Sequence, residues 1–358
     1  MNAMHTVFIT GAAGYVGAML VEQFSKRPDV GKIIALDKEP LPEFLRDNAK
    51  MLWIQSNTAD PGWEAKVTPH APDIVVHTAW QIRELYGNRA LEWKWNIEGS
   101  DRVFAFAFSE VCVRRLIHYS TVASYGSFAE NTLEHRFTEE EPFRKSEYLY
   151  AEEKRICEEH LRERYRDAKT RGRVPYVSVI RPVAITGPRG RYTRIRFGLQ
   201  AALSGTLKVE KSFWYSLISL LVSFVPVTPK WLRQYIHEDD VVDITALLVF
   251  GAVTEESYET FNIAPPGDVV LGSDMAGAVR KRMLPVKPWM VKTAFFFFWH
   301  LTRGRIPTAR GSWKGYSYPI AVDGSKLTKR YGYRYRYPSK EAFVKIEGRY
   351  AKRVITPL

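Results

Sequence analysis

The sequence predicts an α/β fold: a doubly wound parallel sheet with a smaller, mostly C-terminal lobe. Three observations predict it. Short β-branched runs alternate with longer amphipathic runs, a glycine-rich turn follows the first run, and the alternation fades after about residue 181. Such alternation is typical of parallel strands joined by right-handed helical crossovers. Because ligands bind at the carboxyl ends of these strands, functional residues are expected there.

Six β-branched runs are the expected strands, and helical patterns fill the intervals between them. These runs are Thr6–Thr10, Lys32–Asp37, Met51–Gln55, Asp73–Thr78, Arg114–Ser120 and Tyr176–Arg181. A further segment, Tyr235–Ile244, is expected to return to the sheet. The predicted domains are 1–185, joined by 233–250, and a smaller lobe of 186–232 and 251–358.

The composition narrows the class of protein. The 358 residues are 46% apolar and 25% charged, which excludes disordered, collagen-like and disulfide-rich chains. Cys112 and Cys157 are the only cysteines, as expected in a reducing compartment. The first residues do not resemble a signal peptide, so the expected location is the cytoplasm.

The first predicted strand leads into a phosphate-binding turn. Gly11, Gly14 and Gly17 have GxxGxxG spacing between that strand and a helix. Glycine permits the tight turn and a close approach to pyrophosphate, and the helix directs its N-terminal N–H groups at that charge. Asp37 closes the second strand, where a carboxylate binds ribose hydroxyls and repels a 2′-phosphate. These features predict a Rossmann-type domain that binds NAD rather than NADP, although Lys38 weakens the preference.

A second group of residues carries acid–base chemistry. Tyr150 and Lys154 are four residues apart in an amphipathic helical pattern, so they share one face. A nearby ammonium favours the phenolate form of tyrosine, which makes it a usable base. Ser120 and Thr121 follow a predicted strand, where their hydroxyls can polarise a substrate oxygen.

The sequence resembles the extended short-chain dehydrogenases/reductases, also called the NAD-dependent epimerase/dehydratase family, over nearly its whole length. The matching segments are TGAAGYVG at 10–17, Asp37, HTAW at 77–80, NIEGS at 96–100, STVASYG at 120–126, YAEEK at 150–154, RPVAITGP at 181–188, YIHEDDVVD at 235–243 and FNIAPPG at 261–267. The resemblance implies that Tyr150 is the catalytic acid/base, that Lys154 lowers its pKa and binds ribose, and that Thr121 polarises the substrate. Ser120 is the weaker candidate for that last role.

The resemblance also implies a cofactor site at the strand ends. The family commonly has an aspartate that meets adenine after the third strand, and here Asn57 stands in that place. Asparagine can still hydrogen-bond adenine. The expected cofactor-binding residues are Gly11, Ala13, Gly14, Tyr15, Val16, Gly17, Asp37, Asn57, Thr58, Ala79, Asn96, Tyr150, Lys154 and Pro182.

The substrate class is open between two branches of the family. Ala184 stands where many nucleotide-sugar enzymes have an asparagine that touches the diphosphate, which favours the branch acting on steroids and lipids. Arg233 favours the sugar branch, because an arginine there grips a phosphate in sugar epimerases. Trp80, Ala184 and Arg233 are therefore the candidate substrate-binding residues. The apolar segments Phe213–Thr228 and Thr293–Leu301 offer few polar partners for a sugar.

The charge distribution suggests a further contact. Residues 281–358 hold 18 basic and 3 acidic side chains, a net charge of +15, while the rest of the chain has a net charge of −2. An apolar anchor beside a cationic rim is typical of a protein that rests on an anionic membrane, so peripheral attachment is an expectation. Ordinary solubility is the alternative explanation, and nucleic acid is a less favoured partner. The family resemblance implies a homodimer.

Three functions follow. The first is an oxidoreductase that moves a hydride between nicotinamide and a secondary alcohol or ketone of a largely apolar substrate, with Tyr150 exchanging the proton. The second is a nucleotide-sugar epimerase or dehydratase that uses the same residues without net cofactor turnover. The third is a non-catalytic nucleotide-binding docking protein.

The acidic runs Glu139–Glu141 and Glu238–Asp240 have no accompanying His or Cys cluster at ligand spacing, so no metal site is predicted.

Overall fold

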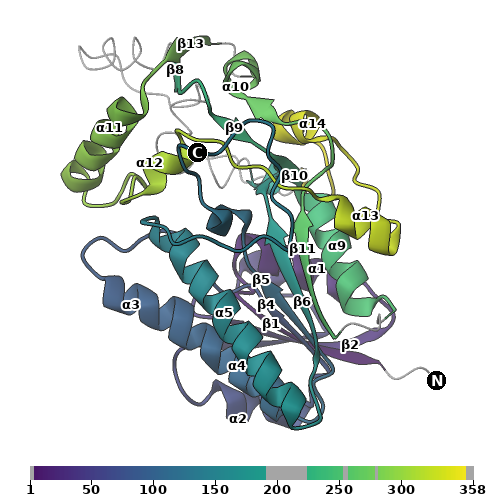
Figure 1. The fold of residues 1–358 in the computed structure, drawn as a ribbon. Helices are drawn as coiled ribbons and strands as arrows, with labels where there is room; N and C mark the ends of the chain where they lie inside the picture. The colour runs from purple at the N-terminus through teal and green to yellow at the C-terminus, as the bar shows by residue number, and fades with distance from the viewer. Residues whose placement is uncertain (1–3, 191–223, 253–256, 279–280, 352–358) are drawn as a thin grey trace. The chain divides into compact units, whose positions relative to one another are not determined.

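The computed structural model describes residues 4–190, 224–252, 257–278 and 281–351 (Figure 1). The chain divides into two compact units. The first comprises Met1–Thr121, Glu153–Arg181 and Val241–Phe261, and the second comprises Val122–Glu152, Pro182–Asp240 and Asn262–Leu358. This division differs from the predicted domain boundaries, because 122–152, 182–185 and 233–240 join the second unit and 251–261 joins the first. Each unit is described by itself below.

A seven-stranded sheet has the order β11-β6-β5-β4-β1-β2-β3. Its strands are β1 (His5–Thr10), β2 (Val30–Asp37), β3 (Met51–Gln55), β4 (Ile74–His77), β5 (Arg115–Tyr119), β6 (Tyr176–Pro182) and β11 (Tyr258–Ile263). The pairs from β3 through to β6 are parallel. The six predicted strands are therefore confirmed, each within two residues. The strand order reverses between β1 and β4, which is where such sheets bind ligands.

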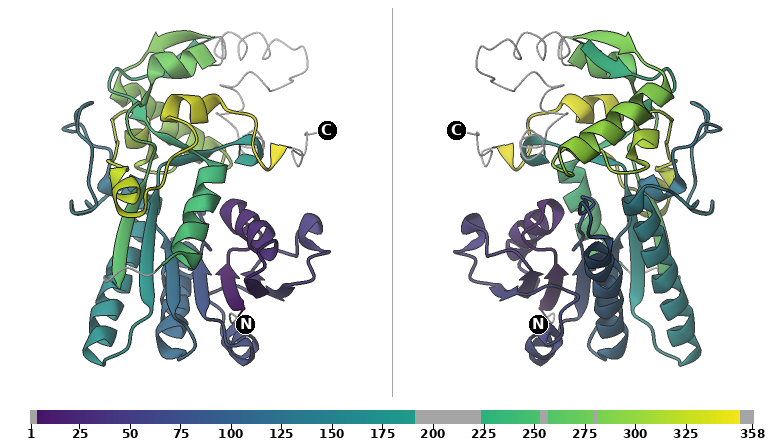
Figure 2. Two further views of the ribbon diagram at one scale, coloured as in Figure 1. Left: turned by 90° about the vertical axis from the view of Figure 1, so that its right-hand side faces the viewer. Right: turned by 90° about the vertical axis from the view of Figure 1, so that its left-hand side faces the viewer.

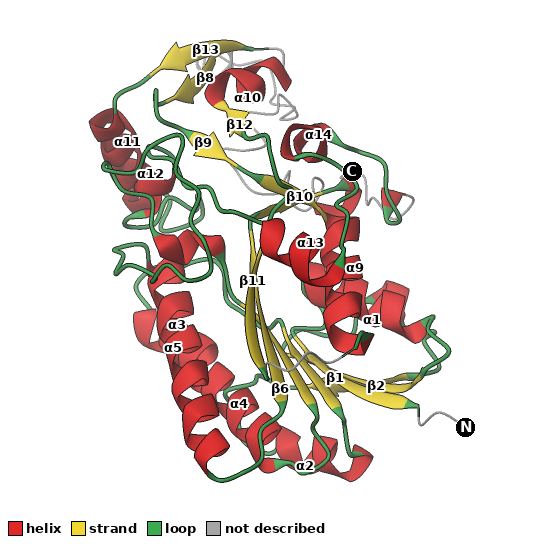
Figure 3. Cartoon of the chain, turned by 45° about the vertical axis from the view of Figure 1, so that its right-hand side comes forward, coloured by secondary structure: helices red, strands yellow, loops and turns green. Residues whose placement is uncertain are grey.

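Helices cover both faces of this sheet, as the alternating sequence pattern requires. Their bounds are α1 (Tyr15–Ser25), α2 (Trp63–Val67), α3 (Arg89–Trp93), α4 (Gly99–Ser109), α5 (Leu149–Thr170) and α9 (Glu238–Phe250). Helices α4 and α5 lie on one face, and α1 and α9 lie on the other (Figure 3). Between α3 and α4 the chain forms a π-helical turn, Lys94–Glu98. Buried aromatic side chains such as Phe8 and Trp63, with ring centroids 5.4 Å apart, fill the core.

The prediction that Tyr235–Ile244 returns to the large sheet is wrong. Tyr235–His237 forms β10, which pairs with β7 (Ala184–Thr186) in a separate two-stranded sheet. The chain then enters α9, whose first turn carries three acidic residues that favour a helix N-terminus. The strand that does join the sheet after α9 is β11.

The second unit is built from short strands and helices. Its strands are β7, β8 (Phe224–Val227), β9 (Leu232–Arg233), β10, β12 (Val270–Leu271) and β13 (Arg282–Pro285). Its helices are α10 (Gly272–Ala278), α11 (Pro288–Leu301), α12 (Ser312–Gly315), α13 (Ser325–Tyr331) and α14 (Ser339–Val344). Helix α11, the long yellow-green helix in the right-hand view of Figure 2, follows β13.

The structure describes only part of the first apolar segment, Phe213–Thr228, and all of the second, Thr293–Leu301. Residues 213–223 of the first lie outside the described residues, and Phe224–Val227 forms strand β8. The second, Thr293–Leu301, belongs to α11, which buries only Phe295 and Trp299. Among the described residues, no helix combines the length and apolar character that crossing a bilayer requires.

Candidate functional site

The glycine turn after β1 has the geometry that the sequence predicts. Gly11 has φ +72°, a conformation that favours glycine, and a Cβ there would lie 2.5 Å from the backbone nitrogen of Ala79. A Cβ at Gly17 would collide with the carbonyl oxygen of Gly11. Both glycines are therefore required by the close packing of the turn against α1 and the end of β4.

The N-terminus of α1 is arranged as an anion site. Gly14 is the N-cap, and no side chain caps the helix. The N–H groups of the first turn, at Tyr15, Val16 and Gly17, cannot bond within the helix and point along its axis. The helix dipole adds positive potential at this end, which suits a pyrophosphate.

Asp37 lies at the end of β2, beside this turn. Its carboxylate accepts hydrogen bonds from the backbone N–H groups of Ala13 and Glu39, both at 2.9 Å. The ammonium of Lys38 lies 3.9 Å from the centroid of the Trp95 ring. Because this cation is held against an aromatic ring, a carboxylate remains the charged group next to the glycine turn, as NAD binding requires.

The residues predicted to meet adenine follow β3. Asn57 closes a turn, since its Oδ1 accepts the N–H of Ala59 at 2.9 Å, which leaves the amide nitrogen as the group available to a base. Thr58 is buried, and its carbonyl accepts a hydrogen bond from the Trp63 indole at 3.1 Å. Thr58 also packs tightly, because a Cβ at Gly99 would lie 2.5 Å from its hydroxyl.

Asn96, another expected cofactor-binding residue, makes hydrogen bonds within the first unit. It is fully buried in the π-helical turn, where its Oδ1 accepts the N–H of Gln81 at 2.7 Å. Its Nδ2 donates to the carbonyl of Gln81 at 3.1 Å and to Oε2 of Glu153 at 2.7 Å. The geometry thus assigns Asn96 to holding the loop that carries Ala79 and Trp80.

Tyr150 and Lys154 both lie on α5, four residues and about one turn apart. The division between the units passes through this helix, so Tyr150 is grouped with the second unit and Lys154 with the first. The Lys154 ammonium donates to the carbonyl oxygen of Tyr119 and lies 3.6 Å from the centroid of the Trp80 ring. Burial lowers the pKa of Lys154 to about 7.

Ser120 and Thr121 directly follow β5, and both are buried. The Ser120 hydroxyl has no hydrogen-bond partner among the described residues. A buried hydroxyl without a partner at a strand C-terminus is suited to a ligand, which provides the missing bond. The next turn is fastened to the start of α5, because the hydroxyl of Ser124 donates to the carbonyl of Ala151 at 2.8 Å. Sequence reasoning did not single out Ser124.

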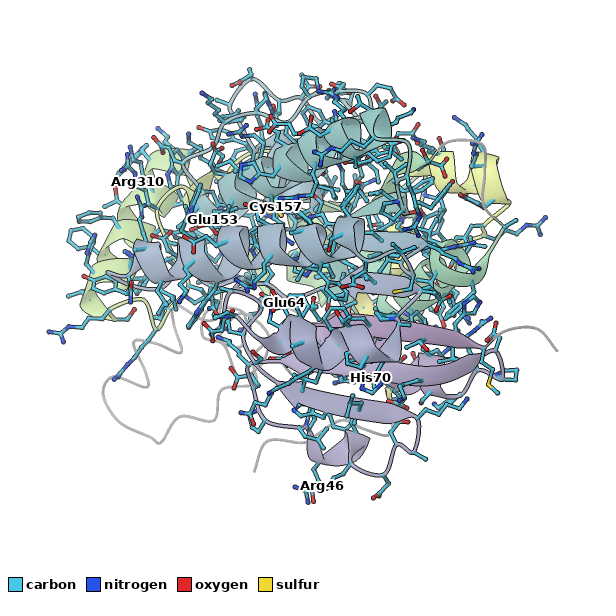
Figure 4. All side chains as sticks on the ribbon, turned by 90° about the horizontal axis from the view of Figure 1, so that it is seen from below. Arg46, Glu64, His70, Glu153, Cys157 and Arg310 are labelled. Atoms are coloured by element: carbon cyan, nitrogen blue, oxygen red, sulfur yellow. The ribbon has the colours of Figure 1, made fainter. Side chains whose placement is uncertain are left out.

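A buried acidic cluster, formed by Glu84, Glu92 and Glu153, was also not predicted. Burial raises the pKa of Glu92 to about 7 and that of Glu153 to about 6, and the cluster's mutual repulsion adds to the shift. Glu153 precedes Lys154 on α5, four residues before Cys157 (Figure 4). No sequence signal marks the cluster, because its members come from separate segments. Among the described residues, no acidic, histidine or cysteine group is arranged to hold a metal ion.

Two buried histidines occupy neighbouring positions in the sheet. His77 on β4 pairs in register with His118 on β5, and their rings stack 5.5 Å apart. His77 contacts the hydroxyls of Thr10 and Ser100 at 2.7 and 2.9 Å. Burial, with the nearby Lys154 charge, lowers the pKa of His77 to about 3, so this ring is neutral at physiological pH.

Arg233, a candidate substrate-binding residue, ends strand β9 in the second unit. Its Nη1 donates to the carbonyl of Leu232 at 2.8 Å, and no carboxylate among the described residues pairs with it. Burial lowers the pKa of Arg233 from its ordinary value, while the phenols of Tyr235, Tyr316 and Tyr148 act in the opposite direction. A half-buried guanidinium with phenols nearby and no carboxylate partner among the described residues is suited to a phosphate.

The other second-unit candidates lie on strands. Ala184 begins β7, and its N–H donates to the carbonyl of Gln234 at 3.3 Å. Pro182 ends β6. Trp80, in the first unit, covers the Lys154 ammonium, so its position is explained by this cation–π contact. Contact with substrate stays a prediction for Ala184 and Trp80, and contact with the cofactor stays a prediction for Pro182.

A parallel sheet with a glycine turn, an acidic residue after β2 and a Tyr–Lys pair on one helix defines a nicotinamide-dependent enzyme of the short-chain dehydrogenase type. The model of the NAD dependent epimerase/dehydratase family matches residues 7–264. The chain belongs to this family. The predicted family, fold class, enzyme type and NAD cofactor are thereby confirmed.

Several solved structures share the fold. WbmG of Bordetella bronchiseptica, in complex with NAD and UDP, is 20% identical, with 95% of this chain and 92% of that chain covered and a TM-score of 0.66. The UDP-glucose 4-epimerase of Thermotoga maritima, with UDP-glucose, is 19% identical, with coverages of 95% and 96% and a TM-score of 0.66. The dTDP-glucose 4,6-dehydratase of Bacillus anthracis, in complex with NAD, is 15% identical, with coverages of 95% and 94% and a TM-score of 0.65.

Proposed function

We propose that the protein is an NAD-dependent epimerase or dehydratase of a diphosphate-linked sugar. The proposal rests on Arg233, a half-buried guanidinium that no carboxylate among the described residues neutralises. A partly desolvated cation without an anionic partner gains from an anionic ligand, and a diphosphate provides charge-assisted acceptors. The UDP and UDP-glucose named with two of the similar structures support the same substrate class.

This proposal favours the nucleotide-sugar enzyme over the oxidoreductase of apolar substrates, which the sequence alone had favoured. The preference for an apolar substrate relied partly on Thr293–Leu301 as a lining of the substrate site. In the structure Phe296, Phe297 and Leu301 of this segment are exposed instead. The argument from this segment against a sugar therefore no longer holds.

The chemical roles follow from the residues of the chain. Tyr150 is proposed to exchange a proton with the reacting hydroxyl of the substrate. Lys154, when protonated, stabilises the phenolate of Tyr150 from one helical turn away. The hydroxyls of Ser120 and Thr121 are proposed to bind the substrate oxygen. NAD, when bound, supplies hydride acceptance and return.

A second candidate is net oxidation of a secondary alcohol on an apolar substrate. Ala184 favours it, because a methyl group cannot replace the diphosphate-binding amide of the sugar enzymes.

A dimer formed through helices such as α5 also stays a prediction.

Incubation of the full chain with NAD and a panel of uridine- and thymidine-diphosphate sugars tests the proposal. Anion-exchange chromatography would detect product, and absorbance would detect NADH. Product without net NADH supports the proposal, whereas stoichiometric NADH supports a dehydrogenase. Turnover of an apolar secondary alcohol with none of any sugar would contradict it.

A further inference from the structure

Helix α11 carries an exposed apolar surface, named here the α11 patch. Its members are Trp289 (63% exposed), Met290 (42%), Phe296 (60%), Phe297 (56%), Phe298 (39%) and Leu301 (79%). Contiguous exposed aromatic residues of this kind mark an interaction surface rather than a folding core.

The opposite face of α11 fixes the helix to the second unit. Phe295 is buried, and its ring centroid lies 5.1 Å from that of Tyr316. Lys292 lies over the Trp313 ring at 5.6 Å from its centroid. The helix therefore has a packed side and an apolar outer side, and the residues that the structure describes leave the outer side exposed.

The charge around the patch identifies the occupant. The segment from Lys281 to Lys314 holds eight basic and no acidic residues. Lys287 caps the N-terminus of α11, and Arg303 and Arg305 follow its C-terminus. All three are exposed, and no carboxylate among the described residues forms an ion pair with them.

We infer that the α11 patch docks on an anionic lipid membrane, with the helix lying in the plane of the interface. Fourteen residues span about 21 Å, short of the ~30 Å hydrocarbon core, so the helix is suited to lie along the surface. Aromatic residues enter the headgroup boundary, and flanking cations bind anionic headgroups. A second copy is a poor occupant, because a two-fold interface brings the same cationic flanks together.

The inference goes beyond the proposed chemistry, and its test does not use activity. The full chain is sedimented with vesicles of phosphatidylcholine alone and of phosphatidylcholine mixed with phosphatidylglycerol, at low and high salt. We expect binding to the anionic vesicles that weakens with salt. Absence of binding to the anionic vesicles at low salt would overturn the inference.

Two double variants locate the contact. Phe296→Ser with Phe297→Ser should weaken anionic-vesicle binding by roughly tenfold or more, because the variant buries less apolar side-chain area in the membrane interface. Arg303→Asn with Arg305→Gln should weaken it by roughly 25-fold at low salt, about fivefold for each charge. Asparagine is chosen at Arg303 because that residue has φ +48°.

Matched controls come from the first unit. Phe44→Ser with Val111→Ser removes exposed apolar side chains, and Arg46→Gln with Lys66→Gln removes exposed charges. These controls should bind as the parent does, and thermal melting should show all variants folded. Full binding by the α11 variants, or self-association in solution that only the aromatic α11 variant abolishes, would contradict membrane docking.

Discussion

The ammonium of Lys154 lies 3.6 Å from the centroid of the Trp80 ring and donates to the carbonyl of Tyr119. The end of β5 and the loop after β4 thus hold the lysine from two sides. This enclosure positions the cation, and it also removes the cation from water. The position that the proposed catalytic role of Lys154 requires therefore lowers the stability of the fold.

Replacing Lys154 by methionine tests this cost. The folded pKa of about 7 is below the unfolded value of 10.5, so the unfolded state holds more protons between those values and stability of the parent rises with pH there. We expect Lys154→Met to be more stable than the parent below about pH 7, with the difference shrinking at alkaline pH. Urea denaturation across pH measures it, and turnover should fall by roughly 100-fold. A constant stability difference at every pH would argue against a buried charge.

Glu153→Gln should show the opposite pH dependence. Burial raises the folded pKa to about 6 from 4.5, so the folded state holds more protons in that window and stability of the parent falls as pH rises through it. Glutamine keeps an acceptor for Asn96 without the charge. The free energy of unfolding of the variant should exceed that of the parent by up to about 2 kcal/mol at neutral pH. Under acidic conditions the two should be equally stable. Glu163→Gln, an exposed change on the same helix, serves as the control and should show no such trend.

Asp37 is expected to set the cofactor preference. Asp37→Ser removes the charge that repels a 2′-phosphate, so the ratio of the binding affinity for NADP to that for NAD should rise by roughly tenfold or more. Calorimetric titration with each cofactor gives the ratio. Glu39→Ser removes the neighbouring, more exposed carboxylate and should leave it nearly unchanged. An unaltered ratio in Asp37→Ser would remove Asp37 from this role.

Arg233→Met tests the diphosphate contact. Loss of a charge-assisted hydrogen bond of about 1.5–3 kcal/mol should raise KM for a sugar diphosphate by roughly 10- to 100-fold. NAD affinity, measured by calorimetry, should not change. Arg334→Met, at an exposed position in the same unit, is the matched control. Equal effects of the two substitutions would count against a specific phosphate site.

Local sequence spacing predicted much of the site. The glycine turn, Asp37 and the Tyr150–Lys154 pair each depend on a few neighbouring residues, and the structure arranges them as the spacing requires. The contact of Asn96 with Glu153 joins residues 57 positions apart, so no local pattern could indicate it. The apolar composition of Thr293–Leu301 also did not predict the exposure of its side chains, because an apolar run does not reveal whether its side chains face a core or the surface. The segment Tyr235–Ile244 was also misjudged, because it joins a three-residue strand to the first turns of α9, and so short a strand has no pattern that separates it from the helix.

The most direct test of the account is the rate of hydride transfer in Tyr150→Phe. Enzyme loaded with NAD is mixed with the sugar diphosphate that the parent enzyme turns over, and reduction of the nicotinamide is followed by absorbance. The account predicts unchanged NAD affinity with transfer slowed by at least roughly 100-fold, since proton exchange at the phenol is lost. Transfer at the parent rate in Tyr150→Phe would contradict the assignment of Tyr150 as the acid/base.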